Sequence, residues 1–374
     1  MRILVQLSHP AHFHFYRYSI ENWKRDGHEV FILIKTKDIL ESLLEEAGIP
    51  YYNINENVHR GSKFGMLWDM VVRDWRVLCF CVKHKIDLLT GSTVEVAHVG
   101  WLLRKPAICV GEDDAATIPL FVKSIKPFLQ VRLSPVTCRC GSLENKTIHY
   151  AGFMKLAYLH PNKFTSEVKV LAKYGISTEK PFFLVRFASL RAHHDTGING
   201  FSTEKAQGLI NVLSKYGDIY ITSERELEPQ FEKYRLHINP LEIHHVMAFA
   251  KMYIGDSQSM AVEAAMLGVP SLRFNDFAGK IGVLEELERK YELTYGIPSS
   301  QPQLLYEKVK ALLACGDLYE IFQARRQKML SDKIDVTAFF TWFIEKYPAS
   351  HEIMRRDPDY QFNFTVQKSN AHCG

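Results

Sequence analysis

The feature that most constrains the fold is a repeated alternation of short, β-branched apolar runs with longer segments of helical period. In the first half, strands are expected at residues 3–7, 29–34, 51–54, 87–90 and 107–110, and helices at 12–26, 39–47, 66–83 and 94–103. Strands that alternate with helices indicate βαβ units and a parallel sheet. The first half therefore predicts a Rossmann-like domain.

The alternation breaks between residues 134 and 181, where proline and glycine recur, and then starts again. Strands are expected at 182–187, 219–222, 252–254 and 271–274, with helices at 203–215, 241–249, 260–267 and within 303–347. A chain of 374 residues fits two domains. We predict an α/β protein with Rossmann-like domains at 1–150 and 181–348, a linker at 151–180 and an irregular tail at 349–374. The cleft between the two domains is the expected ligand site.

Composition narrows the class of partner. Lys and Arg number 46 against 42 Asp and Glu, a net charge of +4. This mild excess suits an anionic ligand or an acidic membrane surface and is far below that of a nucleic-acid-binding protein. The seven cysteines are scattered and include no C-x-x-C pair, so we expect reduced thiols, no metal site and no cofactor.

No run of about 18 apolar residues occurs, which predicts that no segment spans a membrane. The first ten residues, MRILVQLSHP, lack the apolar stretch and cleavage site of a signal peptide. We therefore expect a cytoplasmic protein, with the inner face of the membrane as a further location.

The strongest motif is YIGDSQSMAVEAAMLGVP at residues 253–270. A strand ends at Ile254, a turn follows at Gly255 and Asp256, and a helix opens with Ser257, Gln258 and Ser259. Free amides and the positive end of the helix dipole would suit a diphosphate. Glu263 lies four residues after Ser259, so it shares their face of the helix and could accept ribose hydroxyls. Alternatively, Asp256 and Ser257 only cap the helix.

This motif resembles the donor-binding segment of GT-B enzymes, which include glycosyltransferases and non-hydrolysing UDP-N-acetylglucosamine 2-epimerases. The resemblance implies that Ser257, Gln258 and Ser259, with Asp256 and Met260 beside them, hold the diphosphate and that Glu263 holds the ribose. It also implies that His244 lines the base pocket. Ser223, after the strand at 219–222, is a further candidate for nucleotide-sugar binding.

The chain is similar, over most of its length, to an uncharacterised prokaryotic family of unknown function related to GT-B enzymes. The similar segments are SHPAHFHF at 8–15, Gly152 with AYLHP at 157–161, Arg186 with AHHD at 192–195, and IHH at 243–245. The resemblance implies a GT-B-like fold and gives no substrate.

A second polar cluster follows the first strand of the second half. Its candidates for charge and donors on a diphosphate are Arg186, Arg191, His193 and His194, and Asp195 could fix a histidine tautomer. The alternative for any single one of these residues is a packing or surface role.

Three histidines follow the first strand: His9, His12 and His14. Histidine is the usual base for an acceptor hydroxyl near neutral pH, and His12 is the first choice. A metal site is the rival, but side chains two residues apart on a helix point apart. Asp113 and Asp114 follow the fifth strand and would orient or deprotonate an acceptor, or form a solvated acidic turn.

The apolar helix expected at 66–83 carries Trp68, Trp75, Arg73 and Arg76. It is expected either to pack against the sheet or to rest on a bilayer surface beside a lipid-linked acceptor.

These features predict a metal-independent glycosyltransferase that moves a sugar, expected to be UDP-linked, to a glycan or lipid-linked acceptor in surface polysaccharide or glycoconjugate synthesis. The alternatives are a UDP-sugar 2-epimerase and a binding protein without catalysis. Epimerases of that family carry an acid in the loop after the fourth strand, whereas TGSTV at 90–94 has none before Glu95.

Overall fold

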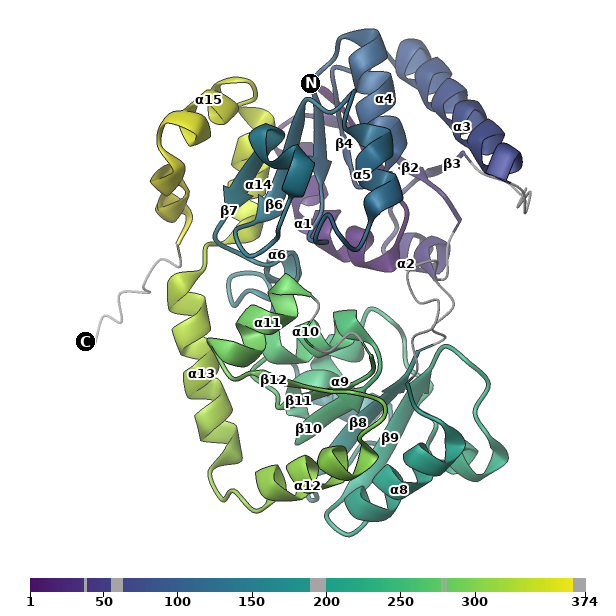
Figure 1. Cartoon of the computed structure of the whole chain (residues 1–374), viewed down its shortest axis with the longest axis vertical. Helices are drawn as coiled ribbons and strands as arrows, with labels where there is room; N and C mark the ends of the chain where they lie inside the picture. Colours follow the sequence, from purple (N-terminus) through teal and green to yellow (C-terminus); the bar gives the residue numbers. More distant parts are fainter. Residues whose placement is uncertain (37–38, 55–62, 189–199, 277–278, 280, 366–374) are drawn as a thin grey trace. The chain divides into compact units, whose positions relative to one another are not determined.

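The computed structural model describes residues 1–36, 39–54, 63–188, 200–276, 279 and 281–365 (Figure 1). The chain divides into two compact units. Unit 1 consists of residues 1–163 and 333–374, and unit 2 of residues 164–332.

Unit 1 holds a seven-stranded sheet in the order β3-β2-β1-β4-β5-β6-β7. Every neighbouring pair is parallel. The strands are β1 (Arg2–Leu7), β2 (Glu29–Ile34), β3 (Tyr52–Asn53), β4 (Leu88–Gly91), β5 (Ala107–Val110), β6 (Val131–Pro135) and β7 (Thr147–Tyr150). The helices are α1 (Pro10–Arg25), α2 (Leu40–Glu46), α3 (Lys63–His84), α4 (Val94–Leu103), α5 (Pro119–Ile125), α6 (Leu156–Leu159), α14 (Val336–Glu345) and α15 (Ala349–Arg356), with the 3-10 turns η1 (Gly141–Lys146) and η4 (Pro358–Phe364).

Unit 2 holds a five-stranded parallel sheet in the order β12-β11-β10-β8-β9. Its strands are β8 (Phe182–Phe187), β9 (Asp218–Ser223), β10 (Met252–Gly255), β11 (Ser271–Phe274) and β12 (Thr294–Ile297). Its helices are α7 (Lys169–Lys173), α8 (Thr203–Leu213), α9 (Ile243–Phe249), α10 (Gln258–Met266), α11 (Gly282–Arg289), α12 (Pro302–Leu313) and α13 (Leu318–Asp332), with the 3-10 turn η3 (Pro229–Tyr234).

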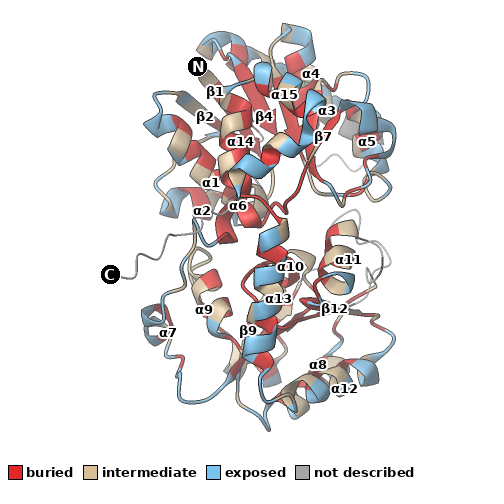
Figure 2. Ribbon diagram, turned by 90° about the vertical axis from the view of Figure 1, so that its left-hand side faces the viewer, coloured by how far each residue is buried: buried red, intermediate tan, exposed pale blue. Residues whose placement is uncertain are grey.

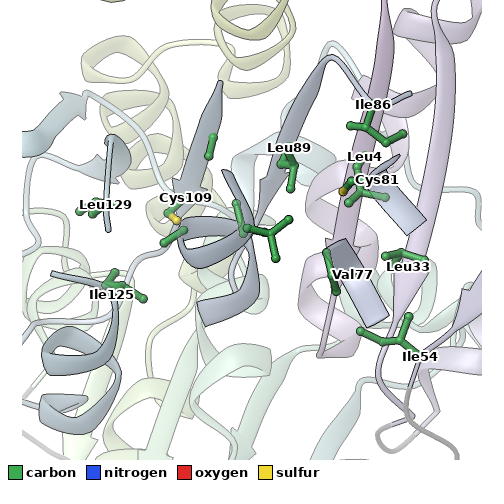
Figure 3. Close-up of a cluster of buried hydrophobic side chains, with 14 of the residues drawn as sticks. Leu4, Leu33, Ile54, Val77, Cys81, Ile86, Leu89, Cys109, Ile125 and Leu129 are labelled. Atoms are coloured by element: carbon green, nitrogen blue, oxygen red, sulfur yellow. The ribbon is translucent and has the colours of Figure 1, made fainter. Parts of the chain in front are cut away.

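Both sheets are buried between helices, which explains their continuous apolar runs (Figure 2). In unit 1 one face of β1 and β4 packs through Leu4 and Leu89 against Val77 and Cys81 of α3 (Figure 3). The segments predicted as strands and as helices in both Rossmann-like halves are thereby confirmed as strands and as helices.

The sequence analysis did not identify β6 and β7, which lie in the region expected to end the first domain. Their residues are less apolar than those of the inner strands, and β6 carries Arg132 as its second residue. This arginine is fully buried, and its guanidinium donates to the carbonyl of Asp113 at 2.9 Å. A buried charged residue with such a partner breaks the apolar pattern without breaking the strand.

The C-terminal helices correct the predicted boundaries. Residues 333–348 were assigned to the second domain, but α14 belongs to unit 1, where it packs on α1. The ring of Phe340 in α14 packs at tilted or edge-on angles against Phe15, Tyr16 and Trp23, at centroid distances of 4.9, 5.3 and 5.7 Å. The tail expected to be irregular contains α15 and η4. The region expected as a linker contains α6 and α7.

Candidate functional site

The strand order places the strongest sequence motif, at residues 253–270, beside the topological switch point of the unit 2 sheet. In the order β12-β11-β10-β8-β9 the chain winds outward in opposite directions from β8 and β10, so the switch point lies between these two strands. Gly255 at the end of β10 pairs with Arg186 near the end of β8. Ligands of open α/β sheets bind beside the carboxyl ends of strands at such a point.

The start of α10 stands directly after this edge. Ser257 is the N-cap, and its hydroxyl accepts from the amide of Met260 at 3.5 Å. Within the described part of the chain, no acceptor contacts the backbone amides of Gln258 and Ser259. Residues 257–260 are partly exposed.

Gln258 adds an unusual feature at the same place. Both polar atoms of its side chain, Nε2 and Oε1, are hidden from solvent, and among the described residues neither has a hydrogen-bond partner. Buried polar groups are normally paired, so an unpaired amide at a helix start points to a missing partner such as a ligand oxygen.

Gly255 is required by the close packing of β8 and β10. A Cβ at this position would lie 2.5 Å from the Tyr253 hydroxyl, and 2.9 Å from both the Cβ and the carbonyl oxygen of Arg186. No side chain fits there without moving backbone, so the turn into α10 depends on glycine.

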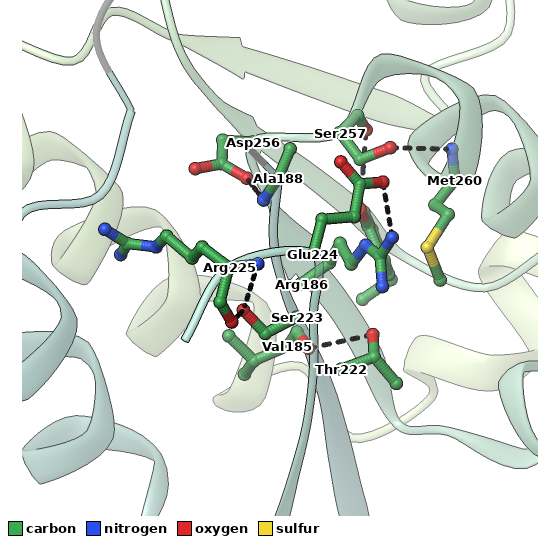
Figure 4. Close-up of polar contacts among 11 residues, drawn as sticks. Val185, Arg186, Ala188, Thr222, Ser223, Glu224, Arg225, Asp256, Ser257 and Met260 are labelled. Carbon is green, nitrogen blue, oxygen red and sulfur yellow. Dashed lines mark hydrogen bonds and ion pairs between the residues drawn. The ribbon is translucent and has the colours of Figure 1, made fainter. Parts of the chain in front are cut away.

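Asp256 points into the protein and binds backbone (Figure 4). Its Oδ1 accepts from the amide of Ala188 at 2.6 Å, and its Oδ2 accepts from the amide of Phe201 at 3.4 Å. Its own carbonyl accepts from Nδ2 of Asn275 at 2.9 Å. The side chain therefore anchors the backbone of Ala188 and Phe201, which lie on either side of residues 189–199 in the sequence. Burial raises the pKa of Asp256 to about 6, against the opposing effect of the amide bonds.

Arg186 and Ser223 form side-chain contacts at the ends of β8 and β9 (Figure 4). The Arg186 guanidinium pairs with Glu224 at 2.5 Å, while its Nε is buried and has no partner among the described residues. Ser223 donates to the carbonyl of Arg225 at 2.7 Å. The sequence analysis did not select Glu224 or Arg225, although both follow β9 at the carboxyl edge of the sheet. The candidates Arg191, His193, His194 and Asp195 lie outside the described residues.

Glu263 and His244 form a buried pair. Nε2 of His244, on α9, lies 3.3 Å from Oε2 of Glu263, on α10. Both side chains are almost completely buried. The sequence placed these two residues in the ribose and base pockets, and the structure brings them into direct contact.

In unit 1 the three histidines of α1 have different surroundings. His9 is the N-cap, and its Nδ1 accepts from the amide of Ala11 at 3.1 Å. His14 packs on Tyr158 with a centroid distance of 5.1 Å. Nδ1 of His12 accepts from the amide of Ser8 at 3.4 Å.

These histidines also stand at a switch point. In the order β3-β2-β1-β4-β5-β6-β7 the direction of winding changes between β1 and β4, and α1 begins directly after β1. The sequence motif and the topology therefore indicate the same edge of the unit 1 sheet.

The two aspartates after β5 differ in environment. Asp113 is exposed, whereas Asp114 is buried and its Oδ1 accepts from the amide of Arg139 at 2.7 Å. Glu112 beside them pairs with Lys155, and its Oε2 accepts from the amide of Met154 at 2.9 Å. Asp114 and Glu112 thus hold neighbouring loops.

In the sequence, Glu95 is the first acidic residue after the fourth expected strand, and the pattern assigns it no role. In the structure it is buried in the first turn of α4, next to the carboxyl end of β4. Its carboxylate accepts from Nε of Arg73 at 2.6 Å and from Nε2 of Gln6 at 3.3 Å. Glu95 is the second residue of α4, and this position directly after β4 is the sequence feature that indicates the carboxyl edge of the unit 1 sheet.

Among the residues that the structure describes, one group of side chains could hold a metal ion. Ligand atoms of Cys140, Glu144 and His149 lie within 4.8 Å of one another. Nε2 of His149 already contacts Oε1 of Glu144 at 2.7 Å, and its Nδ1 contacts the carbonyl of Pro135 at 3.2 Å. The expectation of a protein without metal or cofactor remains a prediction.

The fold defines a class. Among solved structures, S. aureus MnaA with UDP aligns over 93% of this chain and 97% of its own, at 12% identity and a TM-score of 0.63. The spinosyn rhamnosyltransferase SpnG complexed with spinosyn aglycone aligns over 91% and 100%, at 13% identity and a TM-score of 0.60. The UDP-GlcNAc 2-epimerase from Neisseria meningitidis bound to UDP-GlcNAc aligns over 89% and 99%, at 14% identity and a TM-score of 0.60. These likenesses confirm the predicted GT-B-like α/β fold.

The family is shown by sequence. Residues 1–280 match the family described as "Protein of unknown function (DUF354)", and the chain belongs to this family. No curated protein matches the sequence. The predicted membership in a family of unknown function related to GT-B enzymes is thereby confirmed.

Proposed function

We propose that the protein is a glycosyltransferase that takes a sugar from a nucleotide-sugar bound by unit 2. The acceptor is a glycan or a lipid-linked saccharide of surface polysaccharide or glycoconjugate synthesis. Structural neighbours with this fold include a rhamnosyltransferase and proteins that hold UDP or UDP-GlcNAc, which supports a UDP-linked donor.

The start of α10 is the observation that carries the proposal. Its free amides, partly exposed residues and unpaired Gln258 side chain stand at the switch point between β8 and β10. A diphosphate placed there would accept from the amides of Gln258 and Ser259 and lie at the positive end of the helix dipole.

The remaining nucleotide contacts follow from the position of the diphosphate. Glu263 is one turn along α10 from Ser259, so its carboxylate suits the ribose hydroxyls. His244 is the neighbour of Glu263 and orients that carboxylate. Backbone groups at the start of α9 are then placed for the base.

In this proposal, side chains of the protein stabilise the negative charge that develops on the leaving diphosphate. Arg186 at the end of β8 has a buried Nε without a partner among the described residues, and it stands beside Gly255. Arg191, His193 and His194 belong to the segment whose flanking residues Asp256 anchors. Such donors stabilise a developing phosphate charge without a metal ion.

His12 is the proposed base for the acceptor hydroxyl. Because the Ser8 amide donates to Nδ1, the neutral ring carries its proton on Nε2 while that contact lasts. Deprotonation of an acceptor through Nε2 therefore requires the other tautomer, whereas deprotonation through Nδ1 requires the Ser8 contact to open. Asp113, which is exposed, is the second candidate to orient the acceptor.

One observation favours the alternative, a UDP-sugar 2-epimerase. Glu95 supplies a buried carboxylate next to the carboxyl end of β4, where the sequence alone showed no acid in the loop. Its carboxylate oxygens are already engaged by Arg73 and Gln6, which leaves Glu95 poorly placed to contact a substrate. The transferase therefore remains the preferred function.

A product analysis separates the two functions. Purified protein is incubated with a panel of nucleotide-sugars, with and without lipid-linked or glycan acceptors, and the nucleotide pool is analysed. Release of nucleoside diphosphate that depends on an acceptor is expected, and His12→Asn is expected to lower the turnover about 100-fold with donor affinity unchanged. A new sugar epimer without release would favour the epimerase, and neither product from any donor would refute both.

A further inference from the structure

Helix α3 is apolar on two opposite sides, and one of these sides is uncovered. Trp68, Val71, Trp75 and Val82 are 58%, 49%, 64% and 62% exposed, and Cys79 is exposed as well. Their spacing of three, four, four and three residues places all five on one stripe of the helix. The stripe is about 20 Å long at 1.5 Å per residue.

The opposite side of α3 packs on unit 1, so the helix is held in place without any contact made by this stripe. Val77 and Cys81 are buried in the core of unit 1 with Leu4 and Leu33 (Figure 3). The packing that the sequence analysis expected is therefore present, yet it uses only the inner side. Two exposed tryptophans on the outer side add nothing to that core.

Neighbouring helices extend the apolar surface. Helix α4 lies between α3 and α5 in unit 1 (Figure 1). Trp101 and Leu102 at the end of α4 are 54% and 58% exposed, and Leu120 of α5 is 78% exposed. A surface hollow at the same place is lined by Trp101, Leu102, Arg104 and Gln130. We call these eight apolar residues the outer apolar face: Trp68, Val71, Trp75, Cys79, Val82, Trp101, Leu102 and Leu120.

The exposed charges beside this face are mainly positive, with Asp87 as an exposed acid near Lys85. Exposed cations stand next to its apolar residues in the sequence: Arg76, Lys83, Lys85, Arg104, Lys123 and Lys126. Over residues 68–84, 94–103 and 119–125, all of them described, no acidic side chain is exposed. Two of the acids of these helices are engaged by neighbouring side chains, since Asp74 contacts His98 at 2.8 Å and Glu95 contacts Arg73 at 2.6 Å, and Asp69 is partly exposed.

We propose that the outer apolar face docks on the surface of an anionic phospholipid bilayer. Tryptophan is enriched at the headgroup level, and an apolar stripe flanked by cations is typical of a helix that lies in the interface. None of the described helices is long and apolar enough to cross a bilayer, so α3 lies on the surface. The cations would contact lipid phosphates. This docking does not depend on the proposed sugar transfer.

Flotation of the full-length protein with vesicles tests the proposal. We expect binding to vesicles of phosphatidylglycerol and phosphatidylethanolamine, and at least about tenfold weaker binding to phosphatidylcholine vesicles, because each nearby cation gains from anionic lipid. Trp75→Glu should weaken binding to the anionic vesicles at least about tenfold, since it removes apolar area and adds a negative charge. Lys83→Glu should weaken it less, and this effect should vanish at high salt.

Leu304→Glu is the matched control, since Leu304 is 45% exposed on α12 in unit 2. It should bind vesicles like the wild type, and all variants should bind nucleotide equally, which separates this proposal from the transferase. Absence of wild-type binding, or equal weakening by Leu304→Glu and Trp75→Glu, would overturn the proposal. So would a wild-type dimer that Trp75→Glu converts to a monomer in the absence of any vesicle binding, because a second copy would then cover the face.

Discussion

At the scale of single residues, the sequence indicates a candidate site but does not show which groups each side chain contacts. Asp256 shows the difference. The motif suggested that it lies beside a diphosphate, whereas its carboxylate accepts backbone amides from Ala188 and Phe201. A sequence pattern locates the turn, but only three-dimensional contacts decide whether a carboxylate faces the ligand or the protein. The role that this geometry suggests for Asp256 is to hold the backbone of Ala188 and Phe201 in place.

The pKa of Asp256 makes a stability prediction. Burial raises this pKa from 3.8 to about 6, so the folded protein holds the proton more tightly than the unfolded chain. The stabilising contribution is full below the unfolded pKa and is lost as the pH rises through about 6. Relative to Asp256→Asn, the wild type should lose about 2 kcal/mol of unfolding free energy between pH 4 and pH 7. Urea denaturation of both proteins measures this, and parallel pH curves would contradict it.

Glu263 carries the prediction for ribose binding. Glu263→Gln keeps the size of the side chain but weakens hydrogen bonds to two hydroxyls, each worth about 1.5–3 kcal/mol with a charged acceptor. The dissociation constant for UDP should therefore rise at least about tenfold in calorimetric titrations. Glu285→Gln, on α11, is the control and should leave the affinity unchanged. Wild-type affinity in Glu263→Gln would remove the ribose assignment.

At the scale of elements, the alternation of apolar runs and helical segments predicted most strands and helices of both units. It missed β6 and β7, where a buried Arg132 and polar residues interrupt the apolar pattern. It also missed β12, in which Tyr295 and Gly296 are partly exposed, and the amphipathic α11. These elements depend on neighbours that the local sequence does not show.

The turn from β10 into α10 depends on one glycine. Gly255→Ala would bring a methyl group to within 2.9 Å of Arg186 backbone, so β8 and β10 must separate. We expect a loss of about 1–3 kcal/mol in unfolding free energy, together with weaker nucleotide binding. Gly316→Ala is the matched control, because no atom lies within 4 Å of a Cβ at that position. Equal stability of the two variants in thermal denaturation would contradict this account.

At the scale of the whole molecule, the chain returns to unit 1 after completing unit 2. The sequence pattern alone predicts that residues up to 348 belong to the second domain. The aromatic contacts of α14 with α1 join residues more than 300 positions apart, and no local pattern encodes such a pairing.

This return gives a prediction about the two units. Phe340→Ala removes a buried ring that contacts Phe15, Tyr16 and Trp23. It should lower the unfolding free energy of unit 1 by about 3–5 kcal/mol. Hydrogen exchange should become faster in α1 and β1 and stay unchanged in α10 and β10. Faster exchange confined to unit 2 would show that α14 belongs to the other unit.

The central claim is that the start of α10 binds the diphosphate of a nucleotide-sugar. Amide hydrogen exchange of residues 255–263, with and without UDP or UDP-N-acetylglucosamine, tests it most directly. We expect slower exchange at Gln258 and Ser259 when the nucleotide is bound, because their free amides then have phosphate acceptors. Saturating nucleotide that protects another part of the chain and leaves these two amides unchanged would contradict the account.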